Sequence, residues 1–170
     1  MARPGARAKR SAGVLLYRIA GAGVEVLLVH PGGPFWRNPD AGAWQIPKGE
    51  MEACEDALTA ARREAEEELG IVLAGDPVPL TVIRQKAGKI VEVFALEQDI
   101  DPADVRGNEF EMEWPPGSGR TQAFPEVDAA RWFSLAEAES AMLESQRPLL
   151  DALRRLTAPA GPDCPPAPCC

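Results

Sequence analysis

The chain is poor in the side chains that most often carry nucleophilic and acid–base chemistry, with one histidine, one tyrosine and four cysteines in 170 residues. The histidine, His30, lies at the end of a β-rich segment, where a structural role is the expectation. No serine or cysteine can be combined with it into a nucleophilic set. If the chain hydrolyses a substrate, we therefore expect direct attack by water without a covalent enzyme intermediate.

The cysteines are too few and too unevenly placed to form a disulfide framework. Three of them lie in a proline-rich C-terminal segment, and Cys54 stands alone. The C-terminal group lacks two paired ligand sets at the spacing of a zinc site. Disordered tails are predicted for residues 158–170 and for the basic residues 1–10.

Long hydrophobic runs are also missing. The run Val14–Leu16 ends at once at Tyr17 and Arg18, so no segment approaches the length of a membrane span. The N-terminal residues contain no hydrophobic segment long enough for a signal peptide, and a cytoplasmic location is the expectation.

An excess of acidic residues narrows the set of partners. The chain has 26 Asp and Glu against 18 Lys and Arg, a formal net charge of −8. A surface of this sign disfavours nonspecific binding to duplex nucleic acid or to an anionic membrane. If the substrate is a polyphosphate, bound metal and a few local cations must offset the repulsion.

The order of apolar patterns and chain breakers predicts one α+β domain over residues 11–157. The predicted strands are residues 11–19 and 24–30 as one hairpin, 44–46, 78–86 and 89–97 as a second hairpin, 108–113 and 130–133. The predicted helices are residues 55–69 and 135–156, the second bent or split by Pro148. Residues 31–43 and 114–120 are rich in breakers and are predicted to be loops.

The segment Arg63–Glu68 holds four carboxylates within five residues of a strong helix former. Glu64, Glu67 and Glu68 share one helical face, where like charges repel. They also lie toward the C-terminal end, where the helix dipole disfavours anions. Clustered carboxylate oxygens suit a hard divalent cation, so this face predicts a Mg²⁺ or Mn²⁺ site. A second, apolar face is predicted to meet the core: Ala57, Leu58, Ala61, Ala65 and Leu69.

The spacing around this helix is more specific than the helix itself. The positions that carry it are Gly49, Glu55, Arg63, Glu64, Glu67, Glu68, Gly70 and Ile71. Together they resemble the Nudix box without a gap, although Ala65 stands where the family more often has a larger aliphatic residue. The resemblance implies an αβα sandwich with a mixed β-sheet between helices. It also implies metal-dependent hydrolysis, by water attack on phosphorus, of a nucleoside diphosphate linked to another group.

The resemblance also implies a role for each box residue. Glu64 has an alternative role, in which it orients or deprotonates the attacking water. Arg63 would hold a box carboxylate in a fixed orientation through its guanidinium. Glu55 is expected to be structural, at the positive end of the helix dipole. The implied ligands of Mg²⁺ or Mn²⁺ are the Gly49 carbonyl and the carboxylates of Glu64, Glu67 and Glu68.

Many family members use a carboxylate outside the box as general base or as an additional metal ligand, in a loop shortly before the last strand. Glu126 is the first candidate by its position. Glu111 and Glu113, on the strand predicted before it, are alternatives. The catalytic set implied by the resemblance is Glu64, Glu67, Arg63 and Glu126.

Residues that lead into the box resemble those of diadenosine polyphosphate hydrolases, with Trp44 expected in the core. Lys48 would contact a phosphate of the substrate. Exposed aromatic side chains in a loop suggest a binding role. The loop residues predicted to stack on a base are Phe35, Trp36 and Arg37.

The substrate stays open between a dinucleoside polyphosphate and a nucleoside triphosphate. The downstream tyrosine of many dinucleoside polyphosphate hydrolases is missing. Where ADP-ribose enzymes often have a proline, the chain has Arg84–Lys86, whose cations would meet phosphates, together with Lys89, or simply border a hairpin.

Two other functions within the same fold are alternatives. A non-catalytic nucleotide-sensing module would usually have lost box carboxylates, which this chain keeps. A prenyl diphosphate isomerase would need a catalytic cysteine, and Cys54 is wrongly placed for it. A monomer or a homodimer is expected.

Overall fold

The computed structural model describes residues 9–36 and 41–159. Most of the two predicted tails, and the predicted substrate-binding residue Arg37, therefore lie outside the described residues. Among the helices of the described part, none is both long and apolar enough to cross a membrane.

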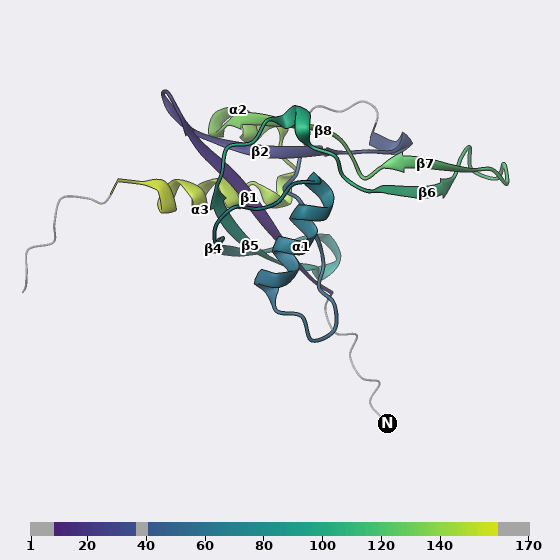
Figure 1. The fold of residues 1–170 in the computed structure, drawn as a ribbon, viewed down its shortest axis with the longest axis horizontal. Coiled ribbons are helices and arrows are strands. Elements are labelled where there is room, and N and C mark those ends of the chain that lie inside the picture. The colour runs from purple at the N-terminus through teal and green to yellow at the C-terminus, as the bar shows by residue number, and fades with distance from the viewer. Residues whose placement is uncertain (1–8, 37–40, 160–170) are drawn as a thin grey trace, which may run out of the picture.

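A six-stranded mixed sheet forms the centre of the molecule (Figure 1). β1 pairs in parallel with β5, and the other pairs are antiparallel. The predicted hairpins are confirmed, because β1 pairs with β2 and β4 with β5 through short turns. Along the sheet the order is β4 (Val78–Arg84), β5 (Ile90–Glu97), β1 (Arg10–Ala20), β2 (Gly23–Pro31) and β8 (Val127–Ser134), with β3 (Lys48–Glu50) on the N-terminal part of β1.

Helices cover both faces of this sheet, which confirms the predicted αβα sandwich. α1 (Ala57–Leu69) packs on one face, and α2 (Leu135–Ala141) and α3 (Pro148–Thr157) pack on the other. Successive residues of β1 alternate between the two cores, as a pleated strand requires. Leu15 joins the core under α2 and α3, whereas Val14 and Leu16 join the core under α1.

The predicted C-terminal helix was expected to be either bent or split at Pro148. It is split into two helices, α2 and α3. α2 starts with a capping box between Ser134 and Glu137 and ends at Ala141. A short 3₁₀ turn, η4 (Glu144–Gln146), follows, and Pro148 then begins α3. Proline fits the first turn of a helix because it lacks the N–H that would have no partner there.

Several predicted boundaries were wrong. The short strand is β3 at Lys48–Glu50 rather than residues 44–46, whose Trp44 and Gln45 form only isolated bridges. α1 begins at Ala57, not Glu55. Leu58 was assigned to the apolar stripe but is 38% exposed, in the first turn of α1, ahead of the first buried residue of the helix, Ala60.

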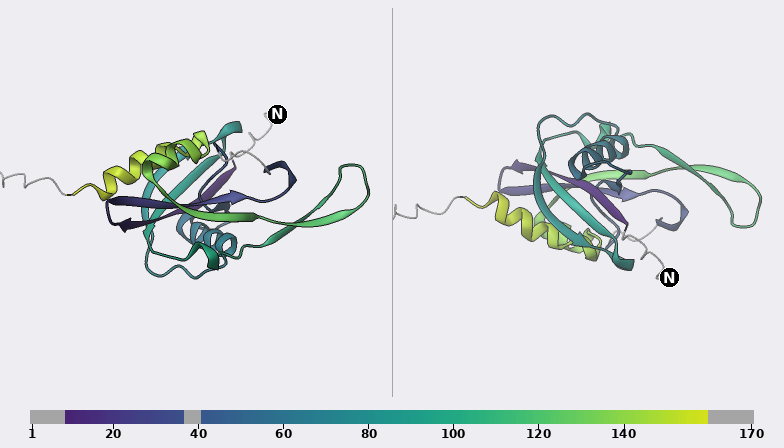
Figure 2. Two further views of the ribbon diagram at one scale, coloured as in Figure 1. Left: turned by 90° about the horizontal axis from the view of Figure 1, so that it is seen from above. Right: turned by 90° about the horizontal axis from the view of Figure 1, so that it is seen from below.

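A two-stranded ribbon projects from the sandwich (Figures 1 and 2). It consists of β6 (Glu109–Glu113) and β7 (Thr121–Pro125), joined by the predicted loop 114–120. β7 was missed in the sequence because four of its five residues are exposed, without a regular alternation. β8 also starts earlier than predicted, at Val127.

Packing of α3 onto the sheet can be tested by a matched pair of leucines. Leu150 is 1% exposed and Leu156 is 43% exposed. Leu150→Ala is expected to lower the free energy of unfolding by about 2–5 kcal/mol, because it leaves a cavity in the core. Leu156→Ala should change it by less than about 1 kcal/mol. Urea denaturation followed by circular dichroism measures both, and equal losses would contradict the assignment of Leu150 to the core.

Candidate active site

Both ends of α1 are fixed by defined caps. The Asp56 carboxylate accepts hydrogen bonds from the Thr59 N–H at 3.0 Å and from the Thr59 hydroxyl at 2.6 Å. Gly70 ends the helix in the left-handed region, at φ 65°, and its N–H donates to the Glu66 carbonyl at 2.8 Å. These caps satisfy backbone groups that helix ends leave without partners, so the register of the acidic residues is set.

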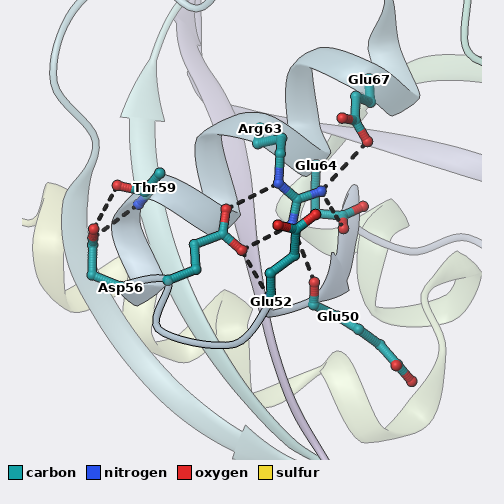
Figure 3. A network of polar contacts seen from close by, with 8 residues as sticks. Glu50, Glu52, Asp56, Thr59, Arg63, Glu64 and Glu67 are labelled. Carbon is teal, nitrogen blue, oxygen red and sulfur yellow. Dashed lines mark hydrogen bonds and ion pairs between the residues drawn. The ribbon is translucent and has the colours of Figure 1, made fainter.

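Around the guanidinium of Arg63 the acidic side chains gather (Figure 3). Arg63 donates two hydrogen bonds to Glu55, from Nε to Oε1 at 2.9 Å and from Nη2 to Oε2 at 3.0 Å. Its Nη1 donates to Glu64 Oε1 at 2.9 Å and lies 3.5 Å from Glu67 Oε2. Nη2 also donates to the Glu50 carbonyl at 3.2 Å. Such a fork fixes the orientation of its partners as well as offsetting their charge.

Glu55 acts through Arg63 rather than through the helix dipole. It precedes the Asp56 cap and lies outside the first turn of α1, so the predicted reason for its structural role was wrong. Its carboxylate also accepts a hydrogen bond from the Glu52 N–H at 2.9 Å, which closes the loop before the helix. The hydrogen bonds from Arg63 hold the pKa of Glu55 below its usual range, and the same contact raises the pKa of Arg63.

Glu64 lies against the backbone of Gly49. A Cβ atom on Gly49 would overlap the Glu64 carboxylate, so only glycine permits this approach. Pairing of Gly49 with Ala12 of β1 holds the glycine in place. Burial raises the pKa of Glu64, Arg63 opposes the rise, and the charges of Glu67 and Glu126 add to it.

Glu68 faces a small pocket together with the predicted distal carboxylate. The pocket has a volume of about 180 Å³, and Glu68, Glu126 and Lys48 are among the residues that line it. Burial raises the pKa of Glu68 to about 8, with Lys48 opposing and the charges of Glu64 and Glu126 adding to the rise. The Lys48 N–H donates to Glu68 Oε2 at 3.2 Å.

The backbone of Glu126 is tied to two neighbouring segments. Its carbonyl accepts a hydrogen bond from the Gly32 N–H at 3.0 Å, and its N–H donates to the Asn108 carbonyl at 2.8 Å. The alternatives Glu111 and Glu113 lie on β6 of the projecting ribbon and are exposed. Glu113 accepts a hydrogen bond from the Gly119 N–H at 2.7 Å, within the loop of the ribbon itself. Of the three candidates, Glu126 is the one that lies beside the box.

A second pocket, of about 720 Å³, shares Gln45 and Lys48 with the first. Burial lowers the pKa of Lys48, the nearby Lys89 adds to this, and the charges of Glu68 and Glu64 oppose it. The pKa of Lys48 therefore depends on two opposing influences, the acids Glu64 and Glu68 and the cation Lys89. The remaining residues that line the larger pocket are Gly42, Gln85, Lys86, Leu143, Glu144, Ser145 and Arg147.

The predicted base-stacking residues are only partly described. Phe35 lies in η1 (Pro34–Trp36), is 70% exposed and packs edge to face on Trp114 with ring centroids 5.7 Å apart. This contact ties the loop to the end of β6 where the ribbon turns into residues 114–120. The side chain of Trp36 and the whole of Arg37 lie outside the described part of the chain, so their roles stay predictions.

Trp44 and His30 belong to the packed interior. Trp44 is 7% exposed and packs against Phe133 with ring centroids 4.9 Å apart, as predicted for a core residue. His30 is 8% exposed, its Nδ1 lies 2.8 Å from Asp128 Oδ1, and its ring meets the edge of Trp44 at 5.3 Å. These partners account for His30 without a catalytic role.

The segment before the box is also held by residues that the sequence did not point to. Gln146 is fully buried, and its Oε1 accepts a hydrogen bond from the Ile46 N–H at 2.9 Å. The Trp44 N–H donates to the Ala141 carbonyl at 3.1 Å. No sequence motif identifies Gln146 or its neighbour Arg147. Gln146 contacts the segment before the box only because η4 folds against residues 44–46.

The donor chemistry of the box fits a divalent metal, although its side chains do not converge. Across residues 9–36 and 41–159, no three His, Cys, Asp or Glu side chains are arranged to hold a metal ion. Glu64 and Glu67 both contact the guanidinium of Arg63. The donors themselves are hard oxygens, with the Glu64 carboxylate in the space left by the missing side chain of Gly49, and Glu68 is a desolvated carboxylate crowded by other acids. Both features suit Mg²⁺ or Mn²⁺.

Comparison with protein families matches the NUDIX domain over residues 7–153. The chain belongs to the NUDIX family. The match confirms the family suggested by the box and spans nearly all of the predicted domain. An octanoyltransferase of Myxococcus xanthus is 31% identical over 130 residues, which cover 76% of this chain and 32% of that protein. This NUDIX chain thus spans about a third of the length of the curated relative that it matches.

Solved structures share the fold. An Ap4A hydrolase of C. elegans in a binary complex has a TM-score of 0.60 and 22% identity, covering 86% of this chain and 96% of that one. A MutT protein of Methanosarcina mazei Go1 has a TM-score of 0.63 and 18% identity, covering 92% and 100%. At these identities the likeness concerns the fold.

The contact between Gly49 and Glu64 predicts the effect of adding one methyl group. Gly49→Ala is expected to displace the Glu64 carboxylate and weaken Mn²⁺ binding at least about tenfold. Gly23→Ala is the matched control, because a Cβ there meets nothing within 4 Å and the backbone needs no left-handed conformation. Calorimetric titration with Mn²⁺ measures both, and unchanged affinity in Gly49→Ala would argue against the box as the metal site.

Proposed function

We propose that this NUDIX-family chain hydrolyses a phosphoanhydride bond in a nucleoside diphosphate linked to another group, with a dinucleoside polyphosphate or a nucleoside triphosphate as substrate. The observation that carries the proposal is the small pocket where Glu68, Glu126 and Lys48 meet. It joins the desolvated carboxylate of Glu68 and the exposed carboxylate of Glu126 to a cation that can contact a phosphate. The family match and the complete set of box carboxylates support the same reaction.

The metal would be Mg²⁺ or Mn²⁺, held by the Gly49 carbonyl and the carboxylates of Glu64, Glu67 and Glu68. When bound, such an ion offsets the negative charge of the pyrophosphate and lowers the pKa of a water molecule. The bare backbone at Gly49 and the crowding of Glu68 by Glu64 and Glu126 support this ligand set.

The protein side chains would divide the remaining work between them. Glu126 accepts the proton of the attacking water, because it faces the pocket and its backbone is held from both sides. Arg63 orients Glu64 and Glu67 and keeps their mutual repulsion from splaying them. Lys48 contacts a non-bridging phosphate oxygen beside Glu68.

A box carboxylate is the first target for testing the proposed reaction. Glu67→Gln is expected to lower kcat at least about a hundredfold with the fold intact, because it removes a charge that holds the metal. Glu66→Gln makes the same change on the same helix, where Glu66 instead accepts a hydrogen bond from the Leu73 N–H, and should stay within a fewfold of the parent.

The assay for this pair uses diadenosine tetraphosphate, ATP and ADP-ribose, each with Mg²⁺, Mn²⁺ or EDTA. Loss of turnover in EDTA is expected. Activity of Glu67→Gln within a fewfold of the parent would refute its assignment as a metal ligand. Binding without turnover of any substrate by the parent, with either metal, would favour the nucleotide-sensing module instead.

The distal base can be separated from its alternatives by three single variants. Glu126→Gln is expected to lower kcat about 10²- to 10⁴-fold and to remove the acidic limb of the pH–rate profile, because the proton acceptor is lost. Glu111→Gln and Glu113→Gln on the projecting ribbon are the matched controls and should keep both the rate and the profile. A profile that survives in Glu126→Gln but not in a ribbon variant would transfer the role to the ribbon.

A further inference from the structure

Among the described residues that line the larger pocket, cations outnumber acids, although the protein as a whole is acidic. Lys48 comes from β3, Lys86 from η2 (Lys86–Gly88) in the turn between β4 and β5, and Arg147 from the start of α3. One carboxylate, that of Glu144, lines the same pocket. Three positive charges against one negative charge, in a chain of net charge −8, give this pocket the opposite sign to the rest of the protein. An anionic ligand is what such a lining attracts.

Among the described residues, none of these three cations forms a side-chain ion pair. Arg18, Arg63 and Arg154 each form ion pairs with carboxylates. Within the part of the chain that the structure describes, neither Lys86 nor Arg147 forms one. Both side chains are exposed at the pocket, so their donors are available to a ligand.

The two pockets are neighbours, because Gln45 and Lys48 line both of them. A phosphate chain that contacts Lys48 can therefore extend from the small pocket toward Lys86 and Arg147. A volume of about 720 Å³ is also in the range that accommodates a small-molecule ligand.

We propose that Lys86 and Arg147 bind a phosphate beyond the bond that is cleaved, so that the protein selects substrates with three or more consecutive phosphates over those with two. This inference rests on the proposed function. The guanidinium of Arg147 is planar and can donate to two phosphate oxygens at once. Lys86, in η2, adds an ammonium group on a flexible side chain. A substrate with only two phosphates leaves both cations unused.

The kinetic test compares diadenosine tetraphosphate with ADP-ribose. In Lys86→Gln and in Arg147→Gln, the ratio of kcat/KM for the tetraphosphate to kcat/KM for ADP-ribose should fall at least about tenfold, as expected for loss of one charged hydrogen bond. The fall should come from KM, because these residues lie away from the reacting phosphorus. Arg155→Gln is the matched control: it removes one charge on α3, eight residues from Arg147, on an exposed side chain that does not line the pocket.

A ratio that stays the same in both pocket variants, or falls equally in Arg155→Gln, would overturn the inference. Circular dichroism and thermal unfolding of each variant confirm that the fold is kept. If the parent protein cleaves no nucleotide, the proposed function fails, and the inference is then decided by binding alone.

The binding test uses inorganic tripolyphosphate and pyrophosphate with Mg²⁺, measured by isothermal titration calorimetry. The parent should bind tripolyphosphate at least about tenfold more tightly than pyrophosphate, and Lys86→Gln and Arg147→Gln should each reduce that preference. Equal affinities in the parent, or a preference that survives in both variants, would show that these cations do not recognise a further phosphate.

Discussion

The guanidinium of Arg63 is the contact on which the arrangement of the acidic helix depends. Like charges at helical spacings repel, and a cation between Glu64 and Glu67 offsets that repulsion. Arg63 contacts both of them, and it also reaches Glu55 in the preceding loop and the Glu50 carbonyl in β3. One side chain therefore joins helix, loop and strand, and sets where the carboxylates stand relative to Gly49.

Close backbone approach is the second constraint. The Glu64 carboxylate occupies the space that any side chain at residue 49 would fill, so strand and helix can meet only at a glycine. Glu126, which also lines the small pocket, lies between β7 and β8, and hydrogen bonds to Gly32 and Asn108 hold its backbone. The acids thus come from two distant parts of the sequence, and Lys48 lies beside both.

Much of the fold followed from local pattern. Strand hairpins over β1–β2 and β4–β5 and the split at Pro148 are properties of apolar alternation, turn glycines and a missing N–H, and these act within a few residues. The predictions that were wrong concern structure that depends on contacts between residues distant in the sequence. Residues 44–46 were predicted as a strand, yet β1 pairs with Lys48–Glu50 instead. β7 has no strand pattern of its own and exists because β6 supplies its hydrogen-bond partners.

The sequence by itself determined the family and the acidic face of α1, because the spacing of glycine, arginine and glutamates is a local property that a helix converts directly into geometry. It could not decide which distal glutamate stands beside the box, since Glu111, Glu113 and Glu126 differ only in which segment packs against the sandwich. Nor could it reveal that Lys86 and Arg147 line one pocket with Lys48. Those residues are brought together by strand pairing and by the packing of α3, and only the tertiary structure fixes such long-range contacts.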